Sequence, residues 1–387
     1  MTLSLSSQNI FDYLIKLGLC TPEDQEYSQI EPKYAKNFNL LLTLTNQSKL
    51  LIKQEPLNQE GKTSGEFFRE WQIQEFFQKF PELSQMRGWI SEGVHFNPDD
   101  SIIIFNYLDN YRDVMAFYSK ENVFPTEIAS AIGTILASIH SLTFNHTDYK
   151  AFFTQEQGNQ SSQNLPHLVK KLGRIGPEIF GSVPADGLKF FSLYQRYDSL
   201  GQAIAELGNS LKSSCLTHND LKLNNILLAD DWEQGFGNST IRLIDWERCS
   251  WGDPAFDLGT LIGSYLNIWL NSMITSKNMS IDESLRMATT PLEAIQPSIA
   301  ALAIAYLNHF PEILEHCPDF LQRVVQFAGW NLIIAIQSTL QYQKSFGNTG
   351  ICMLQVAKSL LCRPEASIST VFGMQASELT STSLSTV

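Results

Sequence analysis

The stretch Leu216–Leu228 reads LTHNDLKLNNILL, and the stretch Ile241–Glu247 that follows it reads IRLIDWE. The first contains a His-x-Asp pattern that ends on Asp220, and Asn225 comes directly before an apolar run that predicts a short buried strand. In the second, an apolar strand ends on Asp245, so the carboxylate stands at a strand terminus. Phosphoryl transfer needs a carboxylate for the attacking hydroxyl, together with oxygen ligands for the metal that neutralises the phosphates. The three side chains therefore predict a phosphoryl-transfer site.

Three phrases in this part of the chain resemble the aminoglycoside phosphotransferase and choline kinase family, small-molecule kinases with a protein-kinase-like fold. Residues 218–225 match the family's His-x-Asp-x4-Asn catalytic loop, and Ile244–Glu247 match the segment that replaces the protein kinase Asp-Phe-Gly. Gly252–Leu258, which read GDPAFDL, match a Gly-Asp-Pro-x-x-Asp-Leu phrase. One such phrase can occur by chance, but three in the right order within a short span are specific.

The resemblance implies an α+β, bilobal protein-kinase-like fold with a small antiparallel-sheet N-lobe and a larger, mainly helical C-lobe. We place the nucleotide-covering N-lobe at residues 1–106, and the C-lobe, with its catalytic loop and helical acceptor subdomain, at residues 107–373. The polar stretch Asn145–Pro166 predicts an exposed loop, and the Ser- and Thr-rich residues 374–387 predict a disordered tail. A chain of 387 residues with 43% hydrophobic content can bury a core of this size.

The resemblance assigns a role to each polar residue of the catalytic loop. Asp220 is the expected catalytic base or hydroxyl-orienting group. Asn225 and Asp245 are the expected Mg²⁺ ligands, because Mg²⁺ prefers oxygen donors. Lys222 stands where protein kinases carry a lysine that reaches the γ-phosphate, and would stabilise charge in the transition state. His218 is expected to hold the loop in shape.

Residues next to the loop have structural roles or open ones. Asn219 replaces the Gly that is usual in the family. This difference affects the expected backbone conformation at this position and not the expected activity. Asp253 and Asp257 are expected to hydrogen-bond the catalytic loop or to cap the next helix. Glu247 either supports the metal from behind its direct ligands or binds substrate. His140 ends an apolar helix and is expected to be packed and hydrogen-bonded.

Residues 37–54 predict a β-hairpin with a turn at Thr45–Ser48, where a kinase would cover and grip the nucleotide. Lys53 comes one residue after an apolar strand, where the family places the lysine that contacts the α- and β-phosphates. Lys49 is the alternative, but it opens the strand next to the turn. No Gly-x-Gly-x-x-Gly loop precedes the hairpin, and Lys36 to Asn39 are the candidates for approaching the phosphates instead.

The segment Ser64–Phe80 predicts a helix that is capped by Ser64 and stopped by Pro81. Glu70 shares a face of this helix with apolar residues, and a carboxylate on such a face requires a cation. By analogy with the kinase lysine–glutamate pair, we expect Lys53 to be its partner, with Glu66 as the alternative carboxylate.

The apolar run Ser101–Phe105 predicts a buried strand that leads into the hinge between the two lobes. By analogy with the family, Asn106, Tyr107 and Leu108 are expected to bind adenine through backbone groups. Backbone recognition leaves little side-chain signature, so this assignment depends on chain order.

The composition limits the possible partners and the compartment. The formal net charge of −13 argues against nucleic-acid binding, because an acidic protein repels phosphate backbones. The six cysteines show no paired spacing, which indicates free thiols in a reducing cytoplasm. The start has no basic region of the kind that signal peptides carry. The longest apolar tract, Leu258–Ile274, is interrupted by polar residues and predicts a core helix, so no membrane partner is expected.

Beyond the motifs the chain is expected to be mainly helical, and these helices resemble the subdomain that builds the acceptor pocket in the family. The predicted helices are Leu258–Ile274, Thr290–His309, Pro318–Ser345 and Gly350–Leu361. An aminoglycoside pocket should present several carboxylates to ammonium groups, but the chain has none between Phe320 and Ser345. This deficit argues against a polycationic acceptor.

The sequence therefore predicts a kinase that transfers the γ-phosphoryl group of ATP, with Mg²⁺, to a hydroxyl of a small molecule. Three alternatives stay open. The acceptor could be Ser or Thr of a peptide or protein. The chain could be a nucleotide-binding scaffold without turnover. The donor could be GTP, or the transferred group could be one other than the γ-phosphoryl group. The sequence leaves the oligomeric state undetermined.

Overall fold

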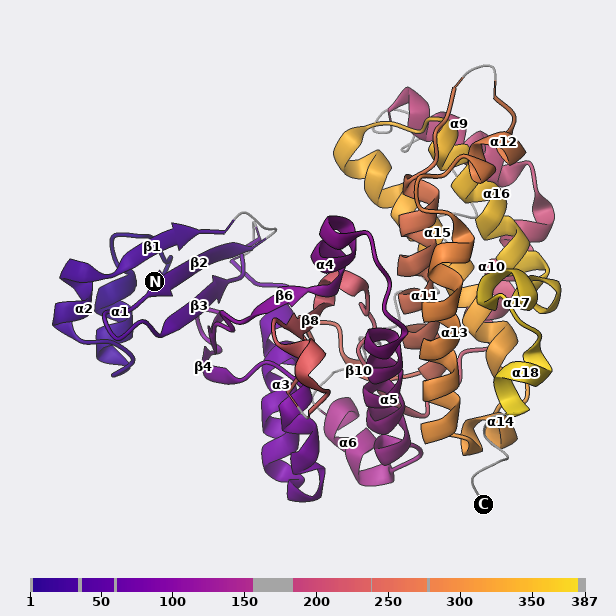
Figure 1. Cartoon of the computed structure of the whole chain (residues 1–387). Coiled ribbons are helices and arrows are strands. Elements are labelled where there is room, and N and C mark those ends of the chain that lie inside the picture. The colour runs from indigo at the N-terminus through magenta and orange to yellow at the C-terminus, as the bar shows by residue number, and fades with distance from the viewer. Residues whose placement is uncertain are drawn as a thin grey trace. The chain divides into compact units, whose positions relative to one another are not determined.

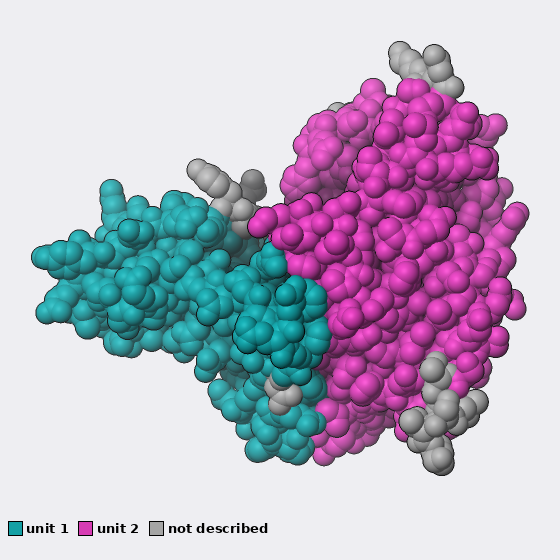
Figure 2. All heavy atoms as spheres, viewed as in Figure 1, with its two compact units in different colours: residues 1–113, 225–249 teal, residues 114–224, 250–387 magenta. Residues whose placement is uncertain are grey.

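The computed structural model describes residues 3–33, 37–58, 61–155, 184–237, 239–276 and 279–381. The chain divides into two compact units, which are coloured separately in Figure 2. Unit 1 comprises residues 1–113 and 225–249, and unit 2 comprises residues 114–224 and 250–387. The expected α+β class is confirmed, because unit 1 contains a five-stranded antiparallel sheet and unit 2 is mostly helical.

The sheet of unit 1 has the strand order β1-β2-β3-β5-β4, and every neighbouring pair is antiparallel (Figure 1). Its strands are β1 (Gln29–Pro32), β2 (Phe38–Thr43), β3 (Lys49–Gln54), β4 (Gly93–Asn97) and β5 (Ile102–Asn106). The predicted hairpin is confirmed as β2 and β3, which pair from Phe38 with Gln54 to Thr43 with Lys49. The predicted strand before the hinge is confirmed as β5.

The two faces of this sheet are covered by different helices, because side chains alternate along a strand. Leu50 and Ile52 of β3 belong to an apolar cluster that includes residues of helix α1 (Ile10–Lys16). Ile103 and Phe105 of β5 form a second cluster with Phe67 of helix α3 (Glu66–Lys79). Leu51 packs against this second cluster, so Lys53, two residues further along β3, faces the α3 side as well.

The remaining elements of unit 1 bring the second chain segment next to the first. A three-stranded sheet has the order β6-β8-β9, and η1 touches it where Ile90 forms a bridge with Leu243. Asn225 lies directly before β8, and Asp245 lies two residues after the end of β9. The elements are α2 (Pro22–Tyr27), η1 (Pro81–Trp89), β6 (Tyr111–Asp113), β8 (Ile226–Ala229), η3 (Trp232–Gln234) and β9 (Ile241–Leu243), and η2 (Leu223–Asn225) crosses from unit 2 into unit 1 at Asn225.

Unit 2 is built around four long helices, of which α5 packs on α13 and α11 packs on α15 (Figure 1). Close approach of α11 and α15 requires Gly259, because a Cβ at this position would lie 2.6 Å from the backbone oxygen of Val324. A two-stranded sheet of β7 and β10 carries the catalytic-loop sequence. The elements are α4 (Val114–Glu121), α5 (Thr126–Thr143), α6 (Thr147–Gln155), α9 (Ala185–Gln195), α10 (Asp198–Asn209), β7 (Cys215–Thr217), β10 (Ser250–Gly252), α11 (Pro254–Asn271), α12 (Ile281–Arg286), α13 (Leu292–His309), α14 (Glu312–His316), α15 (Phe320–Gln343), α16 (Asn348–Cys362), α17 (Pro364–Phe372) and α18 (Ala376–Ser381).

Two expectations about irregular segments are wrong where the structure describes them. The predicted loop Asn145–Pro166 begins with helix α6, because Tyr149 and Phe153 lie four residues apart and both are buried. The predicted disordered tail contains helix α18, which packs on α13 and buries Leu379 completely. Composition alone missed these short apolar faces. The rest of the loop from residue 156 and the tail from residue 382 lie outside the described residues.

No single helix among the described residues is long and apolar enough to cross a membrane. Helices α5 and α6, bent by 95° at their junction, satisfy the length and composition test only as a pair. The predicted core helix at Leu258–Ile274 corresponds to α11, most of whose residues are buried within unit 2.

Candidate active site

Unit 1 encloses a cavity of about 490 Å³ that gathers most of the residues expected to bind the nucleotide. Lys53 of β3, Glu70 of α3 and Asp245 after β9 line it, and so do Asn106, Tyr107 and Leu108 after β5. Ligand pockets commonly have volumes of about 300–1,000 Å³. The cavity is therefore large enough for a nucleotide-sized ligand. Of the candidates Lys36 to Asn39, only Asn39 lines it among the described residues, and Lys36 lies outside them.

Lys53 is held between two carboxylates. Its Nζ lies 2.7 Å from Asp245 Oδ1 and 3.8 Å from Glu70 Oε1, and its side chain is 12% exposed. Burial by itself would lower the pKa of Lys53, but the charges of Glu70 and Asp245 outweigh burial and raise it. Lys53 therefore stays protonated and presents a positive charge in the cavity wall.

Glu70 lies on the buried face of α3, as predicted, and is 4% exposed. The pKa of Glu70 is raised to about 8. Burial is the largest cause, the Lys53 cation opposes it, and the carboxylates of Asp245 and Glu247 raise the pKa further. At neutral pH Glu70 is therefore largely protonated. The distances agree with a protonated Glu70, because Lys53 Nζ lies closer to Asp245 (2.7 Å) than to Glu70 (3.8 Å).

Asn225 and Asp245 are presented from one end of the β8–β9 ladder, where the Ile244 N–H donates to the Asn225 carbonyl oxygen at 3.0 Å. Asp245 has a positive φ of 61°, a conformation that Asp adopts more easily than most residues. The described residues contain no group of three or more His, Cys, Asp or Glu side chains that could hold a metal. Mg²⁺, however, is commonly bound by one or two protein oxygens together with substrate phosphates, so this pair fits.

Two of the three residues expected at the hinge, Asn106 and Tyr107, are fixed to the sheet by their backbones. The Asn106 N–H donates to the Glu92 carbonyl oxygen at 3.3 Å, and the Tyr107 N–H donates to the Lys49 carbonyl oxygen at 2.9 Å. The Lys49 side chain forms an ion pair of 2.5 Å with Asp109 and does not line the cavity. Of the two candidate lysines, Lys53 lines the cavity and Lys49 does not; Lys33 lines it as well.

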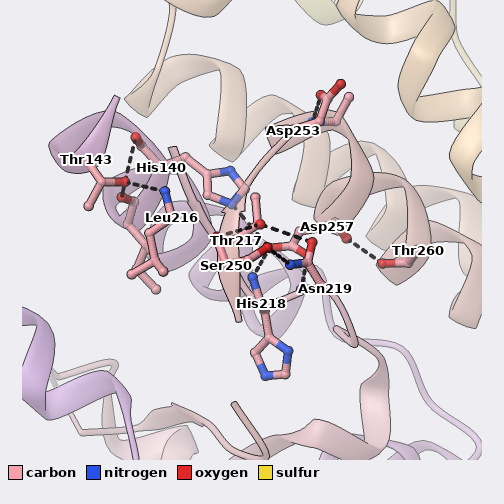
Figure 3. Close-up of polar contacts among 12 residues, drawn as sticks. His140, Thr143, Leu216, Thr217, His218, Asn219, Ser250, Asp253, Asp257 and Thr260 are labelled. Carbon is pink, nitrogen blue, oxygen red and sulfur yellow. Dashed lines mark hydrogen bonds and ion pairs between the residues drawn. The ribbon is translucent and has the colours of Figure 1, made fainter. Parts of the chain in front are cut away.

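Unit 2 holds the catalytic loop by a network of buried hydrogen bonds, shown in Figure 3. The Asp257 carboxylate of α11 accepts from the backbone N–H of His218 at 2.6 Å and of Asn219 at 2.8 Å. His140 Nε2 lies 3.4 Å from the same carboxylate, and its Nδ1 lies 2.8 Å from the Tyr306 hydroxyl. The expected structural roles of His140 and Asp257 agree with these contacts.

Asn219 occupies the left-handed region, with a φ of 62°. Glycine adopts this conformation freely, and Asn is among the residues that tolerate it best. The Asn219 side chain accepts from the Thr217 hydroxyl at 3.0 Å and donates to the Ser250 hydroxyl at 2.7 Å. These bonds join β7 to β10 and offset the absence of glycine at this position.

Asp220 and Lys222 are brought together in the loop itself, where Lys222 Nζ lies 3.0 Å from Asp220 Oδ2. The Asp220 backbone N–H donates to His218 Nδ1 at 3.3 Å, so His218 stabilises the turn that carries Asp220. Asp220 is partly buried, with a side chain that is 23% exposed. The pair thus combines a partly buried carboxylate with a cation whose side chain is 42% exposed.

Asp253 caps α11 by accepting from the Ala255 N–H at 3.0 Å, as predicted. It also accepts from the Lys212 N–H at 2.9 Å and forms a buried ion pair with Arg323 of α15. Arg323 donates in addition to the Ser210 hydroxyl at 2.9 Å. One carboxylate therefore ties the segment before β7 to two of the long helices.

Three residues that hold these sites in place were not predicted from the sequence. Arg323 and Tyr306 lie in apolar helices, with no local pattern that indicates their partners. Glu55 caps α3 from the end of β3, so the predicted cap by Ser64 is wrong; Ser64 instead donates to Glu55 at 2.6 Å. The sequence does contain a signal for Glu55. It lies two residues after Lys53, so in a strand the two side chains lie on the same face.

A family model described as the phosphotransferase enzyme family matches residues 112–274 of the chain. The resemblance seen in the sequence is confirmed. The phosphotransferase-family match covers the catalytic loop, Asp245 and the Gly-Asp-Pro phrase. The roles of individual residues remain predictions.

Among curated proteins, a 4-hydroxytryptamine kinase of Psilocybe cyanescens is 24% identical over 191 residues, which are 46% of this chain. The match spans about half (47%) of that protein's length. Among solved structures, choline kinase LicA from Streptococcus pneumoniae is 17% identical with a TM-score of 0.43, over 92% of this chain and 98% of that one. A streptomycin-ATP-APH(2")-IIa ternary complex is 15% identical with a TM-score of 0.48, over 93% and 99%.

Proposed function

We propose that this protein is an ATP-dependent phosphotransferase that moves the γ-phosphoryl group to a hydroxyl group of a small molecule. The observation that carries the proposal is the cavity of unit 1, which is lined by the Lys53 cation, Asp245 and the three residues expected at the hinge. The match to the phosphotransferase family supports the same reading.

The nucleotide is proposed to occupy this cavity. Leu108 would bind adenine through its backbone, because the N–H groups of Asn106 and Tyr107 already donate to the sheet. Lys53 would bind the α- and β-phosphates, exchanging part of its contact with Asp245 for the phosphate oxygens. Protonated Glu70 would then leave the Lys53 charge available to the phosphates.

Asn225 and Asp245 would hold Mg²⁺, which supplies charge neutralisation to the phosphates when bound. Both residues offer oxygen donors from one end of the β8–β9 ladder, and a site of this kind is completed by phosphate oxygens. Exchange of Lys53 from Asp245 to the phosphates would also free an oxygen of Asp245 for the metal.

Asp220 is proposed to orient the acceptor hydroxyl and to accept its proton. The hydroxyl oxygen then forms a bond to the γ-phosphorus, the bond from that phosphorus to the bridging oxygen breaks, and ADP leaves. Lys222, at 3.0 Å from Asp220, would donate to the transferring phosphoryl group as charge develops.

The acceptor is proposed to be a small hydroxyl compound with little positive charge. Helix α15 carries no carboxylate between Phe320 and Gln343, and Gln326 donates to the Leu361 carbonyl oxygen at 3.2 Å, which uses this amide in helix packing. The curated relative is named as a kinase of 4-hydroxytryptamine, so hydroxylated amines with one ammonium group are the first class to test.

The test is ADP production by purified protein with Mg²⁺-ATP. The acceptors are hydroxylated arylamines, choline, ethanolamine, sugars and aminoglycosides, with Asp220→Ala as the control. A phosphorylated product that is absent with Asp220→Ala supports the proposal. Phosphate on peptides only would favour a protein kinase, and ATP binding without product from any acceptor would favour a scaffold. Product formed with GTP but not with ATP would overturn the ATP assignment.

A further inference from the structure

Glu55 is a buried carboxylate for which the proposed reaction has no direct use. It is 2% exposed and lies immediately after β3. Its Oε1 accepts from the Ser64 hydroxyl at 2.6 Å and from the Glu66 N–H at 3.0 Å, and its Oε2 accepts from the Phe67 N–H at 3.4 Å. The Ser101 hydroxyl also donates to Oε2. Four donors therefore converge on one carboxylate.

These bonds replace the cap that helix α3 lacks. The N-cap residue is Gly65, which has a φ of 72° and no side chain to accept from the first turn. The first N–H groups of a helix have no partner within the helix, and the positive end of the helix dipole favours an anion there. Glu55 accepts hydrogen bonds from the first N–H groups of α3 and places a carboxylate at the positive end of the helix. The start of α3 is therefore attached to the end of β3.

A second attachment lies one helical turn further along α3. Lys53 and Glu55 are two residues apart and therefore point to the same side of the strand. Lys53 contacts Glu70, which is four residues after Glu66 and lies on the same face of α3. The strand thus binds the helix at two successive turns, first through Glu55 and then through Lys53.

We propose that Glu55 is a positioning residue, which fixes α3 against β3 so that Glu70 lies beside Lys53 in the wall of the nucleotide cavity. This inference rests on the proposed phosphotransferase function, because the position of Lys53 matters through nucleotide binding. Without Glu55, the first turn of α3 loses its cap, Glu70 moves away from Lys53, and Asp245 alone holds the lysine. When Lys53 exchanges its contact with Asp245 for the phosphates, it then has no second neighbour that holds its position.

The test compares Glu55→Ala, Glu55→Gln and Glu70→Ala with Glu26→Gln, a control at an exposed position of helix α2 in the same unit. Hydrogen exchange of the Glu66 and Phe67 amides reports the cap. Titration with Mg²⁺-ATP reports nucleotide affinity.

In Glu55→Ala we expect both amides to exchange at least about tenfold faster and ATP affinity to fall about tenfold. Glu55→Gln should have a smaller effect, because one oxygen still accepts, and the control should match the wild type.

A double variant separates positioning from general destabilisation. If Glu55 acts through Glu70, the combination of Glu55→Ala and Glu70→Ala lowers ATP affinity no further than Glu70→Ala alone. Additive losses, or an unchanged affinity when the Glu66 and Phe67 amides exchange faster, would overturn the inference. A wild-type protein that binds no ATP would instead reject the proposed function, and the inference with it, while the exchange data would still show the cap.

Discussion

Lys53 and Asp245, 192 residues apart in the chain, form an ion pair in which Nζ lies 2.7 Å from Oδ1. The lysine is proposed to bind phosphate and the aspartate to bind metal, so each of the two proposed ligand-binding side chains has the other as its partner. In the proposed reaction, binding of Mg²⁺-ATP would be an exchange of partners, which would keep the buried Lys53 charge compensated before and after the exchange.

Replacing the cavity lysine tests this arrangement. In Lys53→Met we expect kcat/KM for ATP to fall about 100-fold or more, because a cation that contacts the phosphates is lost from a buried site. Lys49→Met is the matched control, since this lysine pairs with Asp109 and uses only its backbone at the hinge. Steady-state kinetics at varied ATP measures both. Equal losses in the two variants would contradict the assignment of Lys53.

The raised pKa of Glu70 predicts a pH-dependent contribution to stability. In the unfolded chain Glu70 ionises near its ordinary value of 4.5, whereas burial in the folded protein raises its pKa to about 8. Between these values the folded protein holds a proton that the unfolded chain has released, so the stability contributed by Glu70 falls as pH rises. Glu70→Gln cannot titrate, and its advantage over wild type should grow by up to ~1.4 kcal/mol per pH unit between about pH 4.5 and 8. Urea unfolding of both proteins across this range measures the difference, and a constant difference would show that Glu70 is ionised throughout.

Asp220→Ala should lower turnover by about 1,000-fold or more while leaving ATP affinity nearly unchanged, because the carboxylate acts on the acceptor hydroxyl. Asp231→Ala, at an exposed position further along the chain, is the control and should retain normal turnover. Single-turnover assays and ATP titration separate the two effects. Near-native turnover in Asp220→Ala would remove this residue from the proposed mechanism.

Two ion pairs of unit 2 should differ in their effect on stability. Asp253→Ala leaves the Arg323 guanidinium buried without its carboxylate, which we expect to cost about 3–5 kcal/mol of unfolding free energy. Asp319→Ala breaks a pair with Lys212 in which both side chains are at least 40% exposed, and should cost about 0–1 kcal/mol. Denaturant unfolding of both variants provides the comparison. Similar losses would mean that the buried pair contributes no more than the exposed one.

The left-handed conformation of Asn219 predicts an order among its variants. Asn219→Ala should be the least stable, because it loses the bonds to Thr217 and Ser250 and meets a conformational cost of about 1–2 kcal/mol. Asn219→Gly loses the same bonds but adopts the conformation freely, so it should lie between Ala and the wild type. Thermal unfolding measures the order, and an Ala variant as stable as Gly would show that the backbone relaxes.

The sequence by itself determined the parts of this protein that are local in the chain. The β2–β3 hairpin, the buried face of α3 with Glu70 and the cap of α11 by Asp253 each follow from neighbouring residues, whose spacing fixes the face on which a side chain lies. The catalytic phrases are local too, which is why the family resemblance could be recognised.

Tertiary structure decided which distant residues meet, because packing selects these contacts and periodicity carries no information about them. Lys53 with Asp245 spans 192 residues, His140 with Tyr306 spans 166, and Asp253 with Arg323 spans 70. Glu55 shows how the two kinds of information combine. Its spacing from Lys53 is visible in the sequence, but its use depends on where the sheet places the bare N-terminus of α3.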